Sequence, residues 1–366
     1  MKKTLVLSLA AASVAAAFST ASAADVRIYG RIDTGLVYQH FSGDSTKKDS
    51  FSMESGPSTA SRWGIDASEK ISDDLSVGAR LENRFASDTG ELKGGKGGNR
   101  MFEGNASLKV VSKTWGEIAA GRISGINSGS GPYDLQFFMD STGGGAFGNA
   151  LAPVKSTRMH NMLVYRSPMV SGFQATLQHS LKLEATQDGD ESESAVDRFY
   201  AAGLRYNSGP LNLTAVYEQT IWGHNQAVTP TTDKKILTLG GSYRFEPVTV
   251  YLQAQYFDGV EKIDELKTDS LGALKGYGLY AGTQFWYGLS SWQTMLYWRD
   301  YSGDFRSGSG KLDASSIGLA SKFLYRPSKT IDMYVGVGLA QWNRLDGTKK
   351  MTNKTVNLYS GVTKYF

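Results

Sequence analysis

Cysteine is absent from this chain of 366 residues. Disulfide frameworks, thiolate metal sites and cysteine nucleophiles are therefore excluded together. A surplus of charge is also missing, because 39 Lys and Arg residues nearly balance 35 Asp and Glu residues. Such a balance leaves no electrostatic footprint for nucleic acid, and we expect no nucleic-acid partner.

Residues 1–23, MKKTLVLSLAAASVAAAFSTASA, have the three parts of a secretory signal peptide. Two lysines precede an apolar run from Leu5 to Phe18, and small residues at 21–23 form a cleavage site. The alternative is a membrane anchor, but about 14 apolar residues fall short of the roughly 20 needed to span a bilayer. We predict cleavage after Ala23, so that residues 24–366 form the mature protein outside the cytoplasm.

Long apolar runs and helix-period stripes are missing from residues 24–366, where alternation with a period of two takes their place. In VRIYGRIDTGLVY, Ile28 and Ile32 fall on one face, whereas Arg31 and Asp33 fall on the other. LNLTAVYEQ, VTVYLQAQY and the C-terminal VNLYSGVTKYF repeat the pattern. Each segment is predicted to be a β-strand with one apolar and one polar face.

Sixteen such strands are predicted, joined alternately by tight turns and by long polar connections. The long connections are residues 42–57, 88–99, 124–156, 221–233 and 259–272. Short turns on one rim and long loops on the other are typical of an up-and-down barrel. The strands are predicted near residues 26–41, 58–69, 75–87, 100–112, 116–123, 157–167, 172–182, 197–207, 211–220, 234–246, 248–258, 274–287, 290–301, 313–326, 331–344 and 354–366.

Two all-β architectures could use these strands: a soluble sandwich or propeller, or a transmembrane barrel whose apolar faces point to lipid. A sandwich core would be built from bulky Leu, Ile and Phe, but the apolar faces here are often Ala, Gly, Val and Tyr. The signal peptide, the even strand number and the polar second face favour an antiparallel transmembrane β-barrel with a polar lumen. Alternation in the last strand places Phe366 on the lipid face, where it can join an aromatic girdle.

Several segments together resemble the trimeric, sixteen-stranded general porins of Gram-negative outer membranes. They are VRIYGRIDTGL, SRWGIDASEKISDDLSVGARLENRF, GEIAAGRI and the final YF, and the resemblance covers essentially all of residues 24–366. It implies a passive, water-filled channel in the cell outer membrane for small hydrophilic solutes and ions. It also implies a third loop, about residues 124–156, that folds inward to narrow the pore.

The resemblance further implies a basic pore wall at Arg31, Arg62, Arg158 and Arg100, although the spacing after Arg100 departs from the family pattern. Strand alternation independently directs Arg80 and Arg84, with Asp66 and Glu82, into the lumen. On the third loop the resemblance implies acidic residues at Asp134 and Asp140. The following STGGGAFG departs from the family, which leaves the second loop carboxylate open.

The resemblance also implies partners. We expect a homotrimer, which agrees with small residues on the outer face of the early strands, namely Gly30, Thr34, Ala67, Ala79 and Ala106. Phe366 is expected to act as a C-terminal signal for the barrel-assembly machinery, and lipopolysaccharide is expected around the barrel.

No catalytic residue, cofactor or metal site is predicted. GELKGGKG lacks the Ser or Thr of a phosphate-binding loop, and the four histidines lack metal-ligand spacing. Two alternatives to a general channel stay open. A substrate-selective channel would need a track of aromatic residues, for which Tyr133, Phe137, Phe138 and Phe147 are the only indication. An enzymatic or purely structural barrel would need a convergent catalytic set, which is not visible.

Overall fold

The computed structural model describes residues 24–43, 46–93, 100–136, 154–183, 189–223, 232–261, 263, 274–304, 311–346 and 349–366. The predicted signal peptide lies outside them. The described residues form seventeen β-strands: β1 (Asp25–Gly43), β2 (Thr46–Ser55), β3 (Arg62–Lys70), β4 (Leu75–Arg84), β5 (Asn105–Ser112), β6 (Gly116–Ser124), β7 (Arg158–Arg166), β8 (Phe173–Ser180), β9 (Arg198–Ser208), β10 (Leu211–Ile221), β11 (Lys234–Arg244), β12 (Val248–Val260), β13 (Leu274–Tyr287), β14 (Ser290–Asp304), β15 (Lys311–Ser328), β16 (Ile331–Asp346) and β17 (Lys349–Tyr365).

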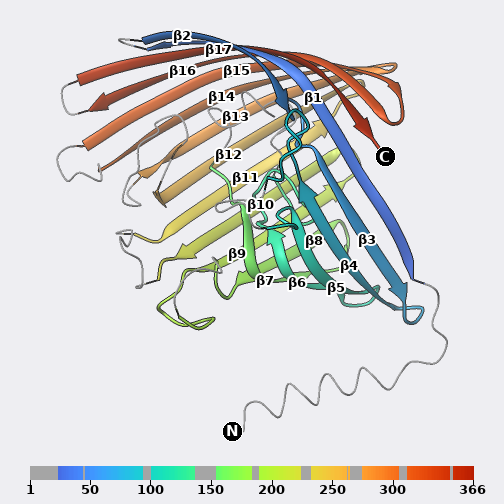
Figure 1. The fold of residues 1–366 in the computed structure, drawn as a ribbon. Helices are drawn as coiled ribbons and strands as arrows, with labels where there is room; N and C mark the ends of the chain where they lie inside the picture. Colours follow the sequence, from blue (N-terminus) through green and yellow to red (C-terminus); the bar gives the residue numbers. More distant parts are fainter. Residues whose placement is uncertain are drawn as a thin grey trace.

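Sixteen of these strands close an antiparallel barrel. From β3 to β17 each strand pairs with the next along the chain, and β1 pairs with both β3 and β17 (Figure 1). The seam continues to the last residue, because Gly30 and Phe366 exchange backbone hydrogen bonds of 2.9 and 3.1 Å. Closure satisfies the backbone groups that an open edge would leave unpaired in lipid. The predicted transmembrane fold class is confirmed.

The seventeenth strand, β2, corrects the prediction of a long loop at residues 42–57. β1 runs to Gly43, and its second half pairs with β2 from Thr34–Ser55 to Gly43–Thr46, while its first half pairs with β3. Polar residues concealed β2 in the sequence, although Phe51 and Met53 alternate with serines.

The predicted strand at 58–69 likewise begins only at Arg62, because the chain turns away from the sheet at residues 56–61. Gly56 there has φ +77°, a conformation that glycine adopts without strain.

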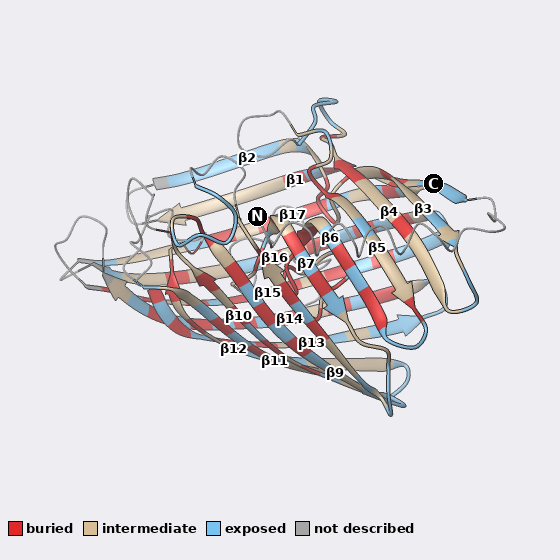
Figure 2. Cartoon of the chain, turned by 90° about the horizontal axis from the view of Figure 1, so that it is seen from below, coloured by how far each residue is buried: buried red, intermediate tan, exposed pale blue. Residues whose placement is uncertain are grey.

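Alternation fixes which side chains face outward. Along β14, Trp292, Leu296 and Trp298 are exposed, whereas Met295 and Tyr297 are buried. Figure 2 shows the same banding of buried and exposed residues along neighbouring strands. The outer face is consequently a belt of large apolar side chains, on which a charge at mid-membrane would cost about 2–4 kcal/mol. Among the described residues no helix is long and apolar enough to cross a membrane.

The wall is lower on one side than on the other. Strands β3 to β8 have 8 to 10 residues, whereas β9 to β17 have 11 to 18. We call β3 to β8 the short wall. It carries most of the arginines predicted from the sequence.

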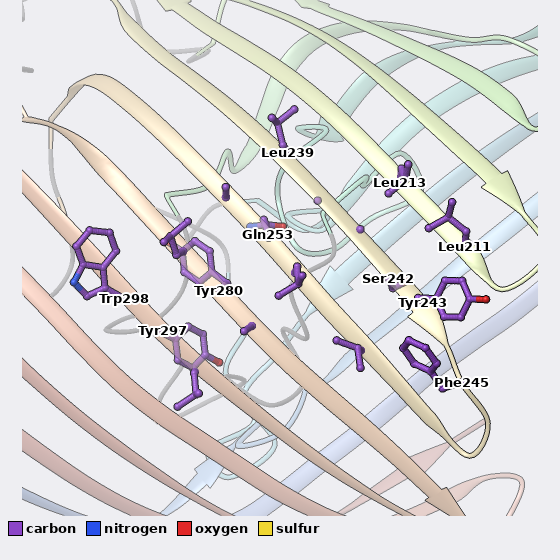
Figure 3. A pocket seen from close by; sticks show the side chains of 18 of the residues that line it. Leu211, Leu213, Leu239, Ser242, Tyr243, Phe245, Gln253, Tyr280, Tyr297 and Trp298 are labelled. Atoms are coloured by element: carbon purple, nitrogen blue, oxygen red, sulfur yellow. The ribbon is translucent and has the colours of Figure 1, made fainter.

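A hollow of about 900 Å³ lies on the outer face of β10 to β15 (Figure 3). Exposed Leu213, Leu239 and Leu252 line it, and Gly241 deepens it because this outward position has no side chain. Its lining is apolar, as expected for a surface that faces lipid. The polar chemistry of this molecule must be sought on the inner face instead.

Candidate functional site

Three of the predicted wall arginines lie side by side on adjacent strands. Arg31 of β1 is opposite Arg62 of β3, and Arg62 is in turn opposite Arg84 of β4. Arg80 lies on the same face of β4. Like charges directly opposite each other destabilise a sheet, so this row needs compensating groups.

Carboxylates compensate three of the arginines. Each of the three guanidinium groups donates hydrogen bonds to one acidic side chain, and such charge-assisted bonds are stronger than neutral ones. The pairs are Arg62 with Glu82 at 3.1 Å, Arg80 with Asp66 at 2.7 Å, and Arg84 with Glu103 at 2.6 Å. Arg80 also stacks over the ring of Tyr29, with 5.5 Å to the ring centroid.

Glu103, in the segment between β4 and β5, is a component that the sequence did not reveal. Burial of the carboxyl favours its neutral form, but hydrogen bonds from Arg84 and the charges of Arg84, Arg158 and Arg122 outweigh burial. Together they hold the pKa of Glu103 below its ordinary value. Glu103 is therefore ionised at neutral pH and neutralises part of the arginine row.

Arg31 and Arg158 differ from the other three arginines. Arg31 donates to the backbone carbonyl of Ala60 at 3.1 Å, and Arg158 donates to the carbonyl of Gly104 at 2.9 Å and to Ser130 at 3.4 Å. Within the part of the chain that the structure describes, neither guanidinium has a carboxylate partner. Carbonyl and hydroxyl groups orient these charges without cancelling them.

A polar cavity of about 320 Å³ brings these groups together on the inner face. Its lining includes Arg31, Arg62, Arg80, Arg158 and Glu82. Other lining residues are Tyr29, Tyr365 and the loop residues Gly131 and Pro132. We call Arg31, Arg62, Arg80, Arg84 and Arg158 the arginine cluster. Its five positive charges face the three carboxylates Asp66, Glu82 and Glu103, so positive charge is in excess.

The described ends of the loop at 124–156 lie against the inner face of the barrel. Ile126, Tyr133 and Leu135 are buried in an apolar cluster with Met162 of β7 and Phe199 of β9. At the other end, Val154 exchanges hydrogen bonds of 2.8 Å with Gln255 of β12. Asn127, near the start of the loop, donates to Thr238 of β11 at 3.1 Å. Both ends of the loop are therefore bonded to the inner face.

Tyr133 anchors the first limb of this loop. Its hydroxyl donates to Glu117, which also accepts from Arg166 at 2.7 Å, and Arg166 stacks over the Tyr133 ring at 5.0 Å. Burial, together with the hydrogen bond to and the charge of Glu117, raises the pKa of Tyr133 far above its ordinary value. The phenol is a permanent neutral donor, which supports an anchoring role for this aromatic residue.

The remaining predicted site residues lie elsewhere. Asp134 is on the loop, but its carboxylate accepts a 2.9 Å hydrogen bond from the Gly129 N–H, and it does not line the cavity. Its carbonyl accepts from Arg205 of β9 at 3.1 Å. Arg100 lies shortly before β5 and is also not among the lining residues. Asp140, Phe137, Phe138 and Phe147 are outside the described residues.

Tyr29 and Tyr365 are lining residues that the sequence reasoning did not select. Alternation carries a signal for Tyr29, because it shares a strand face with Arg31. The Ala60 carbonyl has no such signal, because every residue has a backbone carbonyl and the residue type does not single this one out. Among the described residues no group of three or more His, Cys, Asp or Glu could hold a metal ion.

The comparisons with known proteins agree with this geometry. A family model described as "Gram-negative porin" matches residues 10–343. The chain belongs to the Gram-negative porin family. It is 32% identical over 284 residues to an outer membrane porin protein of Bordetella pertussis, covering 69% of this chain and 68% of that protein.

Solved structures share the fold of this porin. An anion-selective porin from Comamonas acidovorans superposes with a TM-score of 0.61 at 17% identity, covering 94% of this chain and 100% of that one. The trimer form of OmpT, an outer membrane protein of Vibrio cholerae, gives a TM-score of 0.61 at 13% identity with the same coverage. Family and barrel together make the protein a channel of the outer membrane.

Proposed function

We propose that this porin is a passive, water-filled channel for small hydrophilic solutes and ions that favours anions, and that it performs no chemistry. The observation that supports the preference is the pair Arg31 and Arg158, which enter the cavity with orienting carbonyl partners and no carboxylate among the described residues. Fixed positive charge beside a narrow aqueous path concentrates anions and repels cations. The solved porin from Comamonas acidovorans carries the description anion-selective, which agrees with this direction.

We propose that the loop at 124–156 supplies the opposite side of the constriction. Its ends are fixed to the inner face by Tyr133 and Val154, and Gly131 and Pro132 already line the cavity beside the arginine cluster. Asp134 and Asp140 remain the proposed acidic residues of this loop. A loop fixed at both ends narrows the path without closing it.

We also propose the partners of the assembled protein. Three copies would pack through the short wall, where the outward residues Ala67, Ala79 and Ala106 let walls approach closely. The trimer form of the structurally similar OmpT supports this stoichiometry. Lipopolysaccharide would surround the remaining belt, the assembly machinery would recognise the strand ending in Phe366, and residues 1–23 would be removed on export.

Single-channel recording in planar bilayers tests passive diffusion. The conductance should rise in proportion to KCl concentration above about 0.3 M, because the Debye length is then shorter than about 6 Å and fixed charges are screened. Neutral sugars small enough to enter should lower the conductance only through viscosity. Saturation of the current, or block by one solute at micromolar concentration, would instead establish a substrate-selective channel.

A further inference from the structure

Residues 56–61, which join β2 to β3, form a compact segment with buried Gly56, Pro57, Ser58 and Ser61. The segment packs on the inner face of the seam. The Pro57 ring lies beside Gly35 of β1, where an added Cβ would be 3.1 Å from Pro57 Cγ. Ser58 reaches β15, where it accepts a 3.1 Å hydrogen bond from Lys322. We call these residues the seam segment.

Asp33 of β1 is the main anchor of the seam segment. Its side chain is fully buried, and its carboxylate accepts hydrogen bonds from the backbone N–H groups of Ser58 and Thr59. Tyr334 of β16 donates to the same carboxylate at 2.7 Å, and Thr363 of β17 donates to it as well. One buried carboxylate therefore joins three barrel strands to the segment.

The backbone of Asp33 holds the two ends of the segment, Gly56 and Ser61. Gly56 N–H donates to the Asp33 carbonyl at 2.9 Å. The Ser61 hydroxyl donates to the same carbonyl at 3.1 Å and accepts from the Asp33 N–H at 3.0 Å. Ser87, from the chain beyond β4, adds a 2.7 Å bond to the carbonyl. Both ends of the segment are thus tied to a single residue of β1.

This hydrogen-bond network fixes the position of the Ala60 carbonyl, which precedes Ser61 in the chain. It accepts from Arg31 at 3.1 Å and from Arg62 at 3.4 Å, so one oxygen holds two guanidinium groups that face each other across β1 and β3. A carbonyl dipole attracts both groups while removing no net charge. Without this oxygen Arg62 would keep its bond to Glu82, but Arg31 would lose its hydrogen-bond partner and would be repelled by the neighbouring charge of Arg62.

We propose that the seam segment is a second inward-folded element of the channel, and that Asp33 and Ser61 are positioning residues that hold Arg31 and Arg62 at the ion path. This inference rests on the proposed anion preference of the arginine cluster. The charges that anchor the segment, Asp33 and Lys322, are both buried and of opposite sign. The segment therefore shapes selectivity through the placement of arginines and adds little field of its own.

The variant Ser61→Ala tests the proposal without changing any charge. It removes the two hydrogen bonds between the Ser61 hydroxyl and the Asp33 backbone. The variant Ser61→Thr restores the hydroxyl. We expect Ser61→Ala to lower the chloride-to-potassium permeability ratio about twofold, because the attraction between an arginine and a passing anion weakens as the distance between them grows. Ser61→Thr should recover most of the wild-type ratio. Ser242→Ala, at a half-buried serine of β11, a strand that is not a neighbour of β1, β3 or β15 in the sheet, should leave it unchanged.

The variant Asp33→Asn separates positioning from simple electrostatics. Loss of an acidic charge would by itself raise the chloride-to-potassium ratio. The positioning role predicts a fall, because an amide oxygen cannot replace both carboxylate oxygens and the segment loses its anchor. The ratio is measured as a zero-current potential across a KCl gradient, on protein selected as folded by its heat-modifiable migration. If Ser61→Ala folds poorly, Ser58→Ala, which breaks the bond to Lys322, is expected to shift the ratio in the same direction.

Arg31→Ser distinguishes the possible failures. If Arg31→Ser lowers the ratio while Ser61→Ala, Ser58→Ala and Asp33→Asn leave it unchanged or raise it, the positioning role is wrong and the anion preference stands. If Arg31→Ser itself has no effect, the proposed function fails first. A ratio that falls in all of these variants supports both.

Discussion

At the scale of single residues, selectivity depends on which charges are cancelled. Arg62, Arg80 and Arg84 each have a carboxylate within hydrogen-bonding distance, so their contribution to the field is local. Arg31 and Arg158 are oriented by carbonyl groups, and among the described residues neither forms an ion pair with a carboxylate. The charge selectivity of the pore therefore depends less on the number of arginines than on which of them are paired with carboxylates.

Glu103 gives a prediction about pH. Its side chain is only 8% exposed and it binds Arg84, so Glu103→Gln should raise the chloride-to-potassium ratio at pH 7 by leaving Arg84 uncompensated. The pKa of Glu103 is lowered from the ordinary value of 4.5. The wild-type carboxylate therefore stays charged through neutral pH and becomes protonated only as the pH falls below that value.

The wild type and Glu103→Gln should consequently have different chloride-to-potassium ratios at pH 7. In acid the two ratios should converge, because protonation of Glu103 raises the wild-type ratio toward that of the variant. Zero-current potentials measured from pH 7 down to pH 3 check this. Equal ratios at pH 7 would mean that Glu103 does not neutralise the cluster.

Many of the interactions between single residues could not be predicted from the sequence. Alternation placed Arg31, Arg62, Arg80 and Arg84 on one face, because the period of a strand is fixed. Their partners depend on strand register and on segments that leave the sheet, and neither is encoded in local pattern. Glu103 and the Ala60 carbonyl were missed for that reason.

At the scale of elements, the strands were largely predictable because apolar and polar residues alternate in nearly all of them. β2 was missed because its ten residues are mostly polar, and it is held as a strand by pairing with the second half of β1. The inward turn at 56–61 was also missed, since it is created by contacts with Asp33 of β1 and Lys322 of β15 that are distant in sequence. Tertiary pairing thus overrode local composition at both places.

The C-terminal strand carries a prediction about assembly. The Phe366 ring covers Gly30 so closely that a Cβ there would lie 2.4 Å from it, and the backbone of Phe366 closes the seam. Deletion of Phe366 should greatly lower the amount of folded barrel in the outer membrane, because both contacts are lost. The proposed assembly signal would be lost as well.

Phe366→Tyr keeps the ring and the backbone bonds, and should assemble nearly as well as the wild type. Heat-modifiable migration of outer-membrane fractions measures both variants. Normal yield after the deletion would show that the last residue is dispensable for insertion.

At the scale of the whole molecule, the barrel is asymmetric. The short wall bears most of the arginine cluster inside, and its strands β3 to β5 carry the small outward residues Ala67, Ala79 and Ala106 beside larger ones such as Leu108. Strands β9 to β17 bear a belt of large exposed side chains such as Leu252, Leu279 and Leu296. A wall of small residues suits contact with another protein wall, and a belt of large ones suits lipid.

This asymmetry predicts where a bulky residue disrupts the proposed trimer. Ala79→Trp on β4 should favour monomers in mild detergent, because the indole would hold neighbouring walls apart. Ala254→Trp, at an exposed outward alanine of β12, is the matched control and should leave the assembly intact. Native mass measurement distinguishes the species, and an equal effect of both variants would place the contact elsewhere.

The most direct test of the anion preference is the zero-current potential of the assembled channel across a KCl gradient at or below 0.1 M. The wild type should favour chloride, and the double variant Arg31→Ser, Arg158→Ser should shift clearly toward potassium. Arg244→Ser, at an arginine 65% exposed on the rim, should leave the potential unchanged. The shift should shrink near 1 M, where the Debye length falls to about 3 Å. A wild-type channel that favours potassium, or a double variant with an unaltered potential, would contradict the account.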